Sequence, residues 1–291
     1  MKRDILFAIT VIVFSVQTIF ADNAFLGIRA HGKRMTPLSP ISGEYDDPRH
    51  TVSRPDTDLP EYMAGGEVRT VLYFGDSIQI YGAVNGVYAG NAYNDILSDH
   101  DVVPDEDTFY ALDGYAEALA RIFPLRTLSL QGGMRHKLVY ASGDYGENAE
   151  SVIDQMQISD EGPRSYTYRQ RATGYTGGIN YIHRPLDVVY LNLRAGYTYY
   201  PQDNAEMEFE LQGEQDDTNR CAFDLHEYEG SAGLRFLTPV DRMFEYEMGV
   251  KVSHSKYSIK NNNPETGRIY SQNRIEYYEF MPYIELIFPL F

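Results

Sequence analysis

The chain has 291 residues, with 42 Asp and Glu against 25 Lys and Arg, and its formal net charge is −17. So acidic a protein cannot bind nucleic acid by neutralising phosphates, and we expect it to attract cations or basic peptides instead. The mean hydropathy is −0.40, and the single cysteine, Cys221, excludes an internal disulfide.

The N-terminal segment has the pattern of a secretory signal peptide. Two basic residues precede an apolar stretch from Ile5 to Phe20, and Ala21 offers a small residue for cleavage. The stretch is short for a membrane helix, which needs ~20 residues, and no cysteine follows it as a lipoprotein anchor would require. We expect residues 1–21 to be removed and residues 22–291 to form one domain.

A repeated turn organises the rest of the chain. Pro124, Pro185 and Pro239 lie in similar short motifs, and Pro289 lies in a truncated fourth copy. Each interval between them holds two segments of barrel-spanning length and one long polar loop. Short turns on one side and long loops on the other are typical of up-and-down barrels. We expect the proline turns on the periplasmic side, where the chain begins and ends.

The segments between turns alternate in polarity. After Pro185, alternate positions from Val189 to Tyr199 are apolar or small, while polar residues such as Arg194 fill the other face. A period of two with charges on one face predicts lipid outside and a polar lumen inside. The Pro-rich stretch 35–66 is expected to be a long loop or arm, and without the strand before it the barrel would be smaller. The expected strands lie near 24–34, 67–74, 78–91, 107–123, 126–142, 165–183, 188–200, 221–237, 242–259 and 272–290.

The last segment indicates the compartment. It is rich in aromatic residues and ends on Phe291. An apolar strand of this kind suits a protein whose outer face is solvated by lipid and whose backbone is paired by barrel closure. We therefore predict an all-β, membrane-spanning, up-and-down antiparallel β-barrel of the outer membrane. The chain has 25 Tyr and no Trp, so tyrosine is expected to form the interfacial girdles.

A ten-stranded barrel is a narrow cylinder whose lumen side chains fill. Charges on the lumen face are expected to pair, because unpaired buried charges are costly. A general diffusion porin is for this reason the less favoured alternative. The charges expected to pair are Glu227, Glu229, Arg235, Glu245, Glu247 and Lys251.

Acidic residues gather in three segments, 95–107, 144–154 and 203–217, which this topology places in loops outside the cell. One interpretation is a solvated, self-repelling surface, with divalent cations bridging to neighbouring lipopolysaccharide. The other is an electrostatic mouth that attracts cationic substrates. Charge alone favours the solvated surface.

Four segments resemble the omptins, ten-stranded outer-membrane endopeptidases that cut extracellular substrates at basic residues. Ile275–Phe280 (IEYYEF) resembles the closing strand of that family, and Tyr168–Arg171 (YRQR) resembles its Y-K-Q-R run. Residues 232–239 and 128–145 resemble two further omptin segments. The pieces follow the family's order at similar intervals, over roughly Gly90 to the C terminus.

The resemblance implies two acidic residues on one loop facing an Asp–His dyad on another, which together bind and activate a water molecule. Asp99 and Asp101 match the acidic pair, and carboxylates at i and i+2 of an extended segment point the same way. The dyad positions match Ala205 and Met207, neither of which can move a proton.

A substitute for the dyad lies nearby, in Asp224 and His226. Their parity places them on the lipid face, unless a bulge shifts the register. The resemblance also implies that Arg171 holds a lipid A phosphate on the outer wall, which suits a bidentate guanidinium. The alternative is a lumen arginine paired with a glutamate.

Two functions follow from these observations. The favoured one is a non-catalytic, structural or interaction barrel with an acidic extracellular mouth. Its expected partners are outer-membrane lipids, lipopolysaccharide, and cationic peptides or proteins. The alternative is an omptin-like surface endopeptidase that cleaves cationic substrates. No spacing typical of a metal or cofactor site occurs, so neither is expected.

Overall fold

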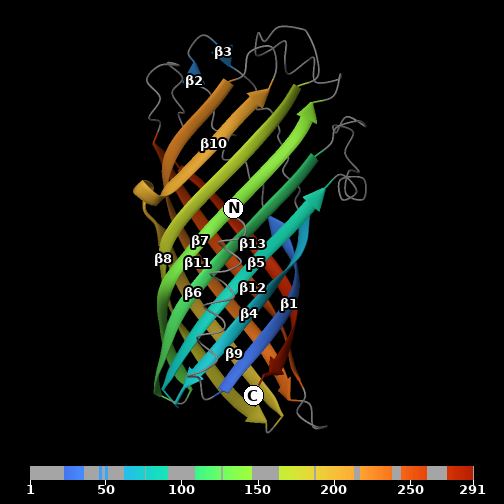
Figure 1. The fold of residues 1–291 in the computed structure, drawn as a ribbon, viewed down its shortest axis with the longest axis vertical. Coiled ribbons are helices and arrows are strands. Elements are labelled where there is room, and N and C mark those ends of the chain that lie inside the picture. The colour runs from blue at the N-terminus through green and yellow to red at the C-terminus, as the bar shows by residue number, and fades with distance from the viewer. Residues whose placement is uncertain are drawn as a thin grey trace.

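The computed structural model describes residues 23–35, 46–47, 50–51, 62–75, 77–90, 109–125, 127–145, 164–186, 188–212, 217–237, 244–260 and 274–290. Within them, eleven strands form one sheet, and its closure makes a tall barrel (Figure 1). No helix in these ranges is long and apolar enough to cross a membrane. The expected signal peptide and the terminal Phe291 lie outside the described residues.

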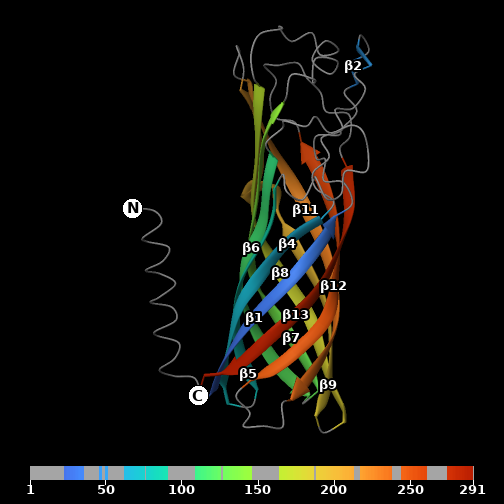
Figure 2. The same cartoon turned by 90° about the vertical axis from the view of Figure 1, so that its right-hand side faces the viewer.

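Ten wall positions make up the barrel, and each strand pairs antiparallel with its neighbours. The last strand pairs with the first through contacts such as Ile28 with Leu286, and this pairing closes the wall (Figure 2). All ten predicted strands are confirmed, with ends that differ by at most five residues. The strands are β1 (Asn23–Met35), β4 (Tyr62–Phe74), β5 (Ile78–Gly90), β6 (Phe109–Leu125), β7 (Leu128–Tyr145), β8 (Arg164–Leu186), β9 (Val189–Tyr200), β11 (Asp217–Leu237), β12 (Glu245–Lys260) and β13 (Arg274–Pro289).

The two ends of the barrel differ. The described turns lie at the end where β1 begins and β13 finishes, and one of them uses Gly75 with a φ of 62°. Only glycine adopts such a φ without strain. Outer-membrane barrels keep short turns on the periplasmic side, so we refer to this as the periplasmic end. Within the predicted arm, β2 (Asp46–Asp47) and β3 (His50–Thr51) pair with each other.

One wall position contains two strands. A 3₁₀ turn, η2 (Gln202–Asn204), follows β9, and β10 (Ala205–Gln212) then continues between β8 and β11 (Figure 1). Tyr175 of β8 pairs with Tyr199, and Ala172 of β8 pairs with Ala205. The chain moves three positions along β8 but six positions from β9 to β10, so η2 and its flanks insert three extra residues. Because this number is odd, odd-numbered side chains face the lumen in β10, whereas even-numbered side chains face it in β9; a bulge has the same effect.

The insertion corrects one expectation. The acidic segment that begins at Asp203 was predicted to be a loop, but most of it is η2 and β10. Glu206 and Glu208 occupy positions on the outer face of β10, since Ala205 and Met207 are buried inward. The alternation of apolar and acidic residues in β10 explains the difference, because it fits a strand that pairs on both sides.

The outer wall carries an apolar belt between two aromatic bands. The exposed belt includes Leu234, Met248, Val252, Phe280 and Ile284. On β13, ten residues separate Tyr278 from Phe288, which corresponds to about 25 Å along the axis of a barrel with ordinary strand tilt. That length matches the hydrocarbon thickness that such barrels span.

Tyrosine and histidine form the extracellular band, which confirms the expected role of tyrosine. Neighbouring rings across four strands lie 4.3–6.2 Å apart between centroids. The Phe236–Tyr246 pair, at 4.8 Å, belongs to the periplasmic band. Aromatic rings with a polar tip suit the lipid–water boundary. The extracellular band consists of Tyr197, Tyr199, His226, Tyr228, His254 and Tyr278.

Side chains fill the lumen. Small residues make room for large ones: a Cβ on Gly233 would lie 2.6 Å from both the Glu247 carboxylate and the Tyr283 hydroxyl. Among the described residues, a cavity beside Arg194 and Tyr115 has a volume of about 30 Å³. Such a volume holds about two water molecules. The lumen is therefore a packed polar core, as expected for ten strands.

The filled lumen predicts that the barrel does not conduct ions. We expect the refolded protein, inserted into a planar bilayer, to show no discrete conductance steps, because no continuous aqueous path crosses a lumen of this packing. The measurement is single-channel recording, with a known diffusion porin as the positive control. Regular, reproducible steps from a pure preparation would contradict the closed lumen.

Candidate functional site

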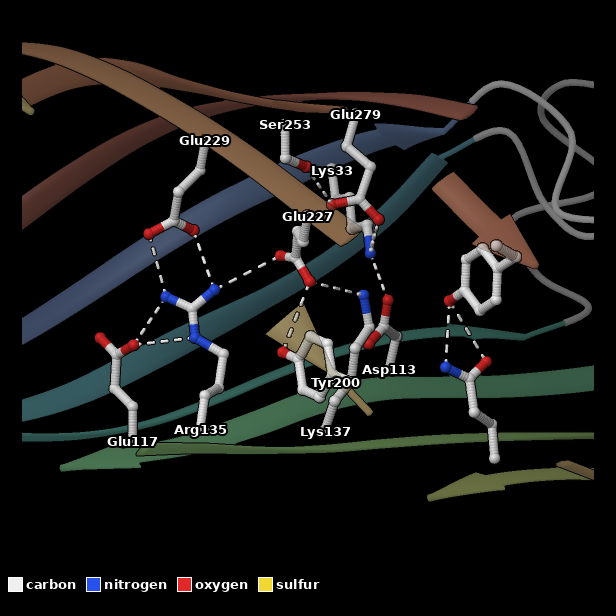
Figure 3. A network of polar contacts seen from close by, with 12 residues as sticks. Lys33, Asp113, Glu117, Arg135, Lys137, Tyr200, Glu227, Glu229, Ser253 and Glu279 are labelled. Carbon is white, nitrogen blue, oxygen red and sulfur yellow. Dashed lines mark hydrogen bonds and ion pairs between the residues drawn. The ribbon is translucent and has the colours of Figure 1, made fainter. Parts of the chain in front are cut away.

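The centre of the lumen is an ion network around Arg135 on β7. Its guanidinium donates to Glu117 at 2.6 Å and to Glu229 at 2.9 Å, and it lies 3.4 Å from Glu227 (Figure 3). Lys251 lies 2.8 Å from Glu229 on the opposite side. Arg135 is 2% exposed. The network thus links β6, β7, β11 and β12 across the lumen rather than along the wall.

Two lysines, Lys33 and Lys137, extend the network toward the extracellular end. The Lys33 ammonium contacts Asp113 and lies 2.6 Å from Glu279 (Figure 3). Lys137 lies 3.6 Å from Glu227. These contacts connect β1 with β6 and β13, so strands that are far apart in the sequence are held by charge as well as by backbone pairing.

The periplasmic half holds a separate group of charges. Arg29 donates to Glu285 at 2.9 Å and lies 3.5 Å from Glu67. Arg69 also contacts Glu285. The Tyr283 hydroxyl donates to Glu247 at 2.7 Å. Glu285 is fully buried, so these partners are required if its charge is to be tolerated.

The charges in the lumen balance. The contacts confirm the expected pairing of Glu227, Glu229 and Lys251, and Arg235 pairs with Glu245 near the periplasmic end. Nine basic and nine acidic side chains are among the described residues that face the lumen. The net charge of −17 is therefore carried by the rest of the chain. The lumen set is Arg29, Lys33, Arg69, Arg121, Arg135, Lys137, Arg194, Arg235 and Lys251, with Glu67, Asp113, Glu117, Glu227, Glu229, Glu245, Glu247, Glu279 and Glu285.

Ala205 and Met207, the positions that match the omptin dyad, face the lumen near its extracellular end. They are 3% and 6% exposed, and they pair with Ala172 and Gln170 of β8. Gln170 donates in turn to the hydroxyl of Tyr257 at 3.0 Å. The strand geometry thus presents both positions inward, but neither side chain can act as an acid or a base.

Asp224 and His226 lie on the outer wall, as their parity predicts. The Asp224 carboxylate accepts hydrogen bonds from the Tyr199 hydroxyl at 3.1 Å and from the backbone N–H of Gln202 at 2.9 Å. The His226 ring lies against Tyr199 at 4.9 Å between centroids, and its Nδ1 is 2.7 Å from the Tyr197 hydroxyl. The odd insertion lies on the neighbouring strand, so it leaves the orientation of β11 unchanged.

These contacts give the two residues a structural role. Asp224 accepts from the first residue of η2, and so it holds the insertion between β9 and β10 in place. His226 belongs to the extracellular aromatic band. Asp99 and Asp101 lie outside the described residues, so their position relative to His226 remains a prediction.

Arg171 is exposed on the outer face of β8. It lies opposite Glu206 of β10 and Leu138 of β7, two residue pairs above the hydrogen bond between His136 and Thr173 at 2.8 Å. The alternative of a lumen arginine is therefore wrong. The position fits the implied contact with a lipid phosphate, which stays a prediction.

Sequence reasoning missed Arg135 and the charges it gathers. The available signal was parity, because Arg135 and Lys137 alternate with outward residues such as Met134 and Leu138. Parity tells which face a side chain occupies but not its partner across the lumen. In the described part of the chain, no group of three His, Cys, Asp or Glu side chains could hold a metal ion.

Comparisons with known proteins find other outer-membrane proteins, at low sequence identity. No family model and no curated protein sequence matches the chain. The solved structures that are similar include the outer membrane protease OmpT from Escherichia coli, at 13% identity, with 93% of this chain and 97% of that chain covered and a TM-score of 0.45. OmpT is an omptin, the family that the sequence resembles.

Two further barrels are similar at lower scores. The Ail protein of Yersinia pestis has 10% identity, covers 91% of this chain and 98% of its own, and has a TM-score of 0.32. A major outer membrane protein from Thermus thermophilus has 10% identity, coverages of 92% and 99%, and a TM-score of 0.35. Scores of this size carry no statement about activity. The closed strand pairing and the lipid-facing belt identify the chain as an outer-membrane β-barrel of ten antiparallel wall positions.

Proposed function

We propose that this chain is a non-catalytic outer-membrane barrel that binds cationic peptides or proteins at its acidic extracellular segments. The observation that carries the proposal is the inward, buried placement of Ala205 and Met207. These positions face the lumen, where an acid–base pair would be needed, and they hold a methyl group and a thioether.

The charge distribution supports the binding half of the proposal. The described lumen set is neutral, so the net charge of −17 is available elsewhere on the chain. Glu206 and Glu208 carry part of it on the outer face of β10. Negative charge of this density attracts cationic partners, and the attraction weakens as salt screens it.

The ion-paired lumen supports a role as a rigid platform. Charge pairs such as Lys33 with Asp113 and Arg135 with Glu229 join strands across the interior. A wall braced in this way holds the extracellular ends of the strands in fixed relative positions, which lowers the entropy lost when a partner binds there.

A single titration tests the proposal against the endopeptidase alternative. The probe is a fluorescent peptide with several Lys–Arg pairs, mixed with the full barrel in detergent and lipopolysaccharide. We expect saturable binding that weakens about tenfold or more between 50 and 300 mM salt, while mass spectrometry finds the peptide intact. An acidic peptide of the same length is the matched control and should not bind.

Two results would overturn the proposal. The first is cleavage of the peptide by the purified barrel that is abolished in both Asp99→Ala and His226→Ala, which would establish the endopeptidase. The second is equal binding of the basic and the acidic peptide. The double variant Ala205→Asp with Met207→His adds a further test, since cleavage regained there alone would show that the acidic pair is still placed for catalysis.

A further inference from the structure

One histidine, His31, is buried in the lumen at the seam where the barrel closes. It lies on β1, opposite Tyr283 of the last strand, β13, on one side and opposite Gly65 of β4 on the other. Its side chain is 7% exposed. Its Nε2 lies 2.7 Å from the amide nitrogen of Asn85 on β5. The imidazole therefore reaches across β4 and joins two strands, β1 and β5, that do not pair with each other.

The contact with Asn85 requires a neutral imidazole. An amide nitrogen only donates, so Nε2 of His31 must accept and carries no hydrogen. The hydrogen of the neutral ring is then on Nδ1, which has no hydrogen-bond partner among the described residues. Protonation would add a hydrogen to Nε2 that points at the amide donor. The imidazolium would thus have no acceptor for either hydrogen, and buried donors without acceptors cost free energy.

The charges around the imidazole also oppose a further positive charge. Arg29 and Lys33 lie two residues before and after it on the same face of β1, which places their Cα atoms about 7 Å from its own. The positive charge of Lys251 on β12 acts on the ring as well. The negative charge of Glu67 on β4 acts in the other direction, but that carboxylate already contacts Arg29 and the Tyr115 hydroxyl.

Carboxylates on the neighbouring strands have partners of their own. Asp113 of β6 and Glu279 of β13 both contact the Lys33 ammonium. The hydroxyl of Tyr283, directly opposite the imidazole on β13, donates to Glu247 of β12 at 2.7 Å. Each of these carboxylates would have to give up an existing contact before it could accept a hydrogen bond from a protonated ring. Burying an additional cation here is therefore costly.

We propose that His31 makes the seam of the barrel sensitive to acid. Near neutral pH, the uncharged ring joins β1 to β5. Below about pH 6.5, where an ordinary histidine takes up a proton, the unfolded chain binds a proton that the folded barrel accepts only by losing this contact. Stability that depends on His31 is therefore fully present above that pH and is lost as the pH falls below it. The seam is separate from the acidic extracellular segments, so the proposal is independent of the proposed function.

Urea unfolding of the full barrel in detergent, followed by far-UV circular dichroism between pH 7.5 and pH 5, tests the proposal. If only the unfolded chain binds the proton, His31 raises the unfolding constant about 30-fold over this range. His31→Gln keeps a neutral side chain that can accept from Asn85, and it should lose this part of the pH dependence. His183→Gln is the matched control at an exposed position of β8, and it should keep that part.

A second variant, Asn85→Asp, tests the direction of the effect and decides the result if His31→Gln does not fold. A carboxylate in place of the amide can accept from the protonated ring, so the urea midpoint should stay constant or rise as the pH falls. The same pH dependence in His31→Gln as in the unmodified barrel would overturn the proposal. So would an undiminished loss of stability with acid in Asn85→Asp, because the partner of the ring would then have no influence on its titration.

Discussion

Arg135→Ala is expected to destabilise the barrel by about 4 kcal/mol, because it leaves buried Glu117 without its cation and takes one of two cations from each of Glu227 and Glu229. Glu117 and Glu229 each lie within 3 Å of the Arg135 guanidinium, and Glu227 lies at 3.4 Å. Native proteins in general have a net stability of about 5–15 kcal/mol. The variant should therefore lose a large part of its stability, measured as the shift of the urea midpoint in detergent.

Arg235→Ala is the matched control. Arg235 pairs with Glu245, but their side chains are 27% and 24% exposed, so water compensates for the lost partner and the cost should stay below about 1 kcal/mol. Arg135→Lys provides an intermediate, because it keeps the charge and loses the bidentate contact to Glu229. Equal midpoints for Arg135→Ala and Arg235→Ala would show that the central network contributes no more than a surface pair.

Gly133→Ala is expected to cost about 3 kcal/mol through backbone displacement. A Cβ at this position would lie 2.0 Å from the carbonyl oxygen of Ala118 and 2.9 Å from the Cα of Leu119, both on the neighbouring strand β6. Backbone atoms cannot move aside as a flexible side chain can, so β6 and β7 would have to separate. The urea midpoint and the yield of refolded barrel both measure the effect.

Gly86→Ala separates this effect from a general intolerance of substitution. A Cβ on Gly86 meets nothing within 4 Å, and the residue lies between the exposed lipid-facing Val84 and Tyr88 on β5. Its replacement should change stability by less than about 0.5 kcal/mol. A loss as large as that of Gly133→Ala would refute the close approach of β6 and β7 as the cause.

The wall strands could be predicted from the sequence because successive side chains of a strand alternate strictly between its two faces. Alternation located each of the ten wall strands, and it placed Asp224 and His226 on the outer face correctly. The aromatic band could be predicted from the number of tyrosines, because the lipid–water boundary favours aromatic residue types and the prediction needs no exact positions. These features depend on local pattern, so one chain without its structure was sufficient.

The sequence could not predict contacts that join distant strands. The turn η2 depends on Asp224, which follows Gln202 by 22 residues and accepts its N–H. Because the insertion contains an odd number of residues, the inward and outward positions of β10 do not continue those of β9. In the sequence, β10 therefore looks like an acidic loop and not like a part of the same wall. Partners across the lumen, such as Arg135 with Glu229, depend on barrel closure and on strand tilt. Neither can be predicted from the alternation of residues along a strand.

The closing contact between β1 and β13 also completes the ion pairs of the periplasmic half. Arg29 and its partner Glu285 are separated by 256 residues, almost the whole chain. Until β13 arrives, Arg29 and Arg69 lack the carboxylate that they share, and β1 presents an unpaired edge. A chain cut short before β13 would lack Glu285, the carboxylate that contacts both of these lumen cations. The ion pairs of the periplasmic half are thus complete only when the last strand pairs with the first.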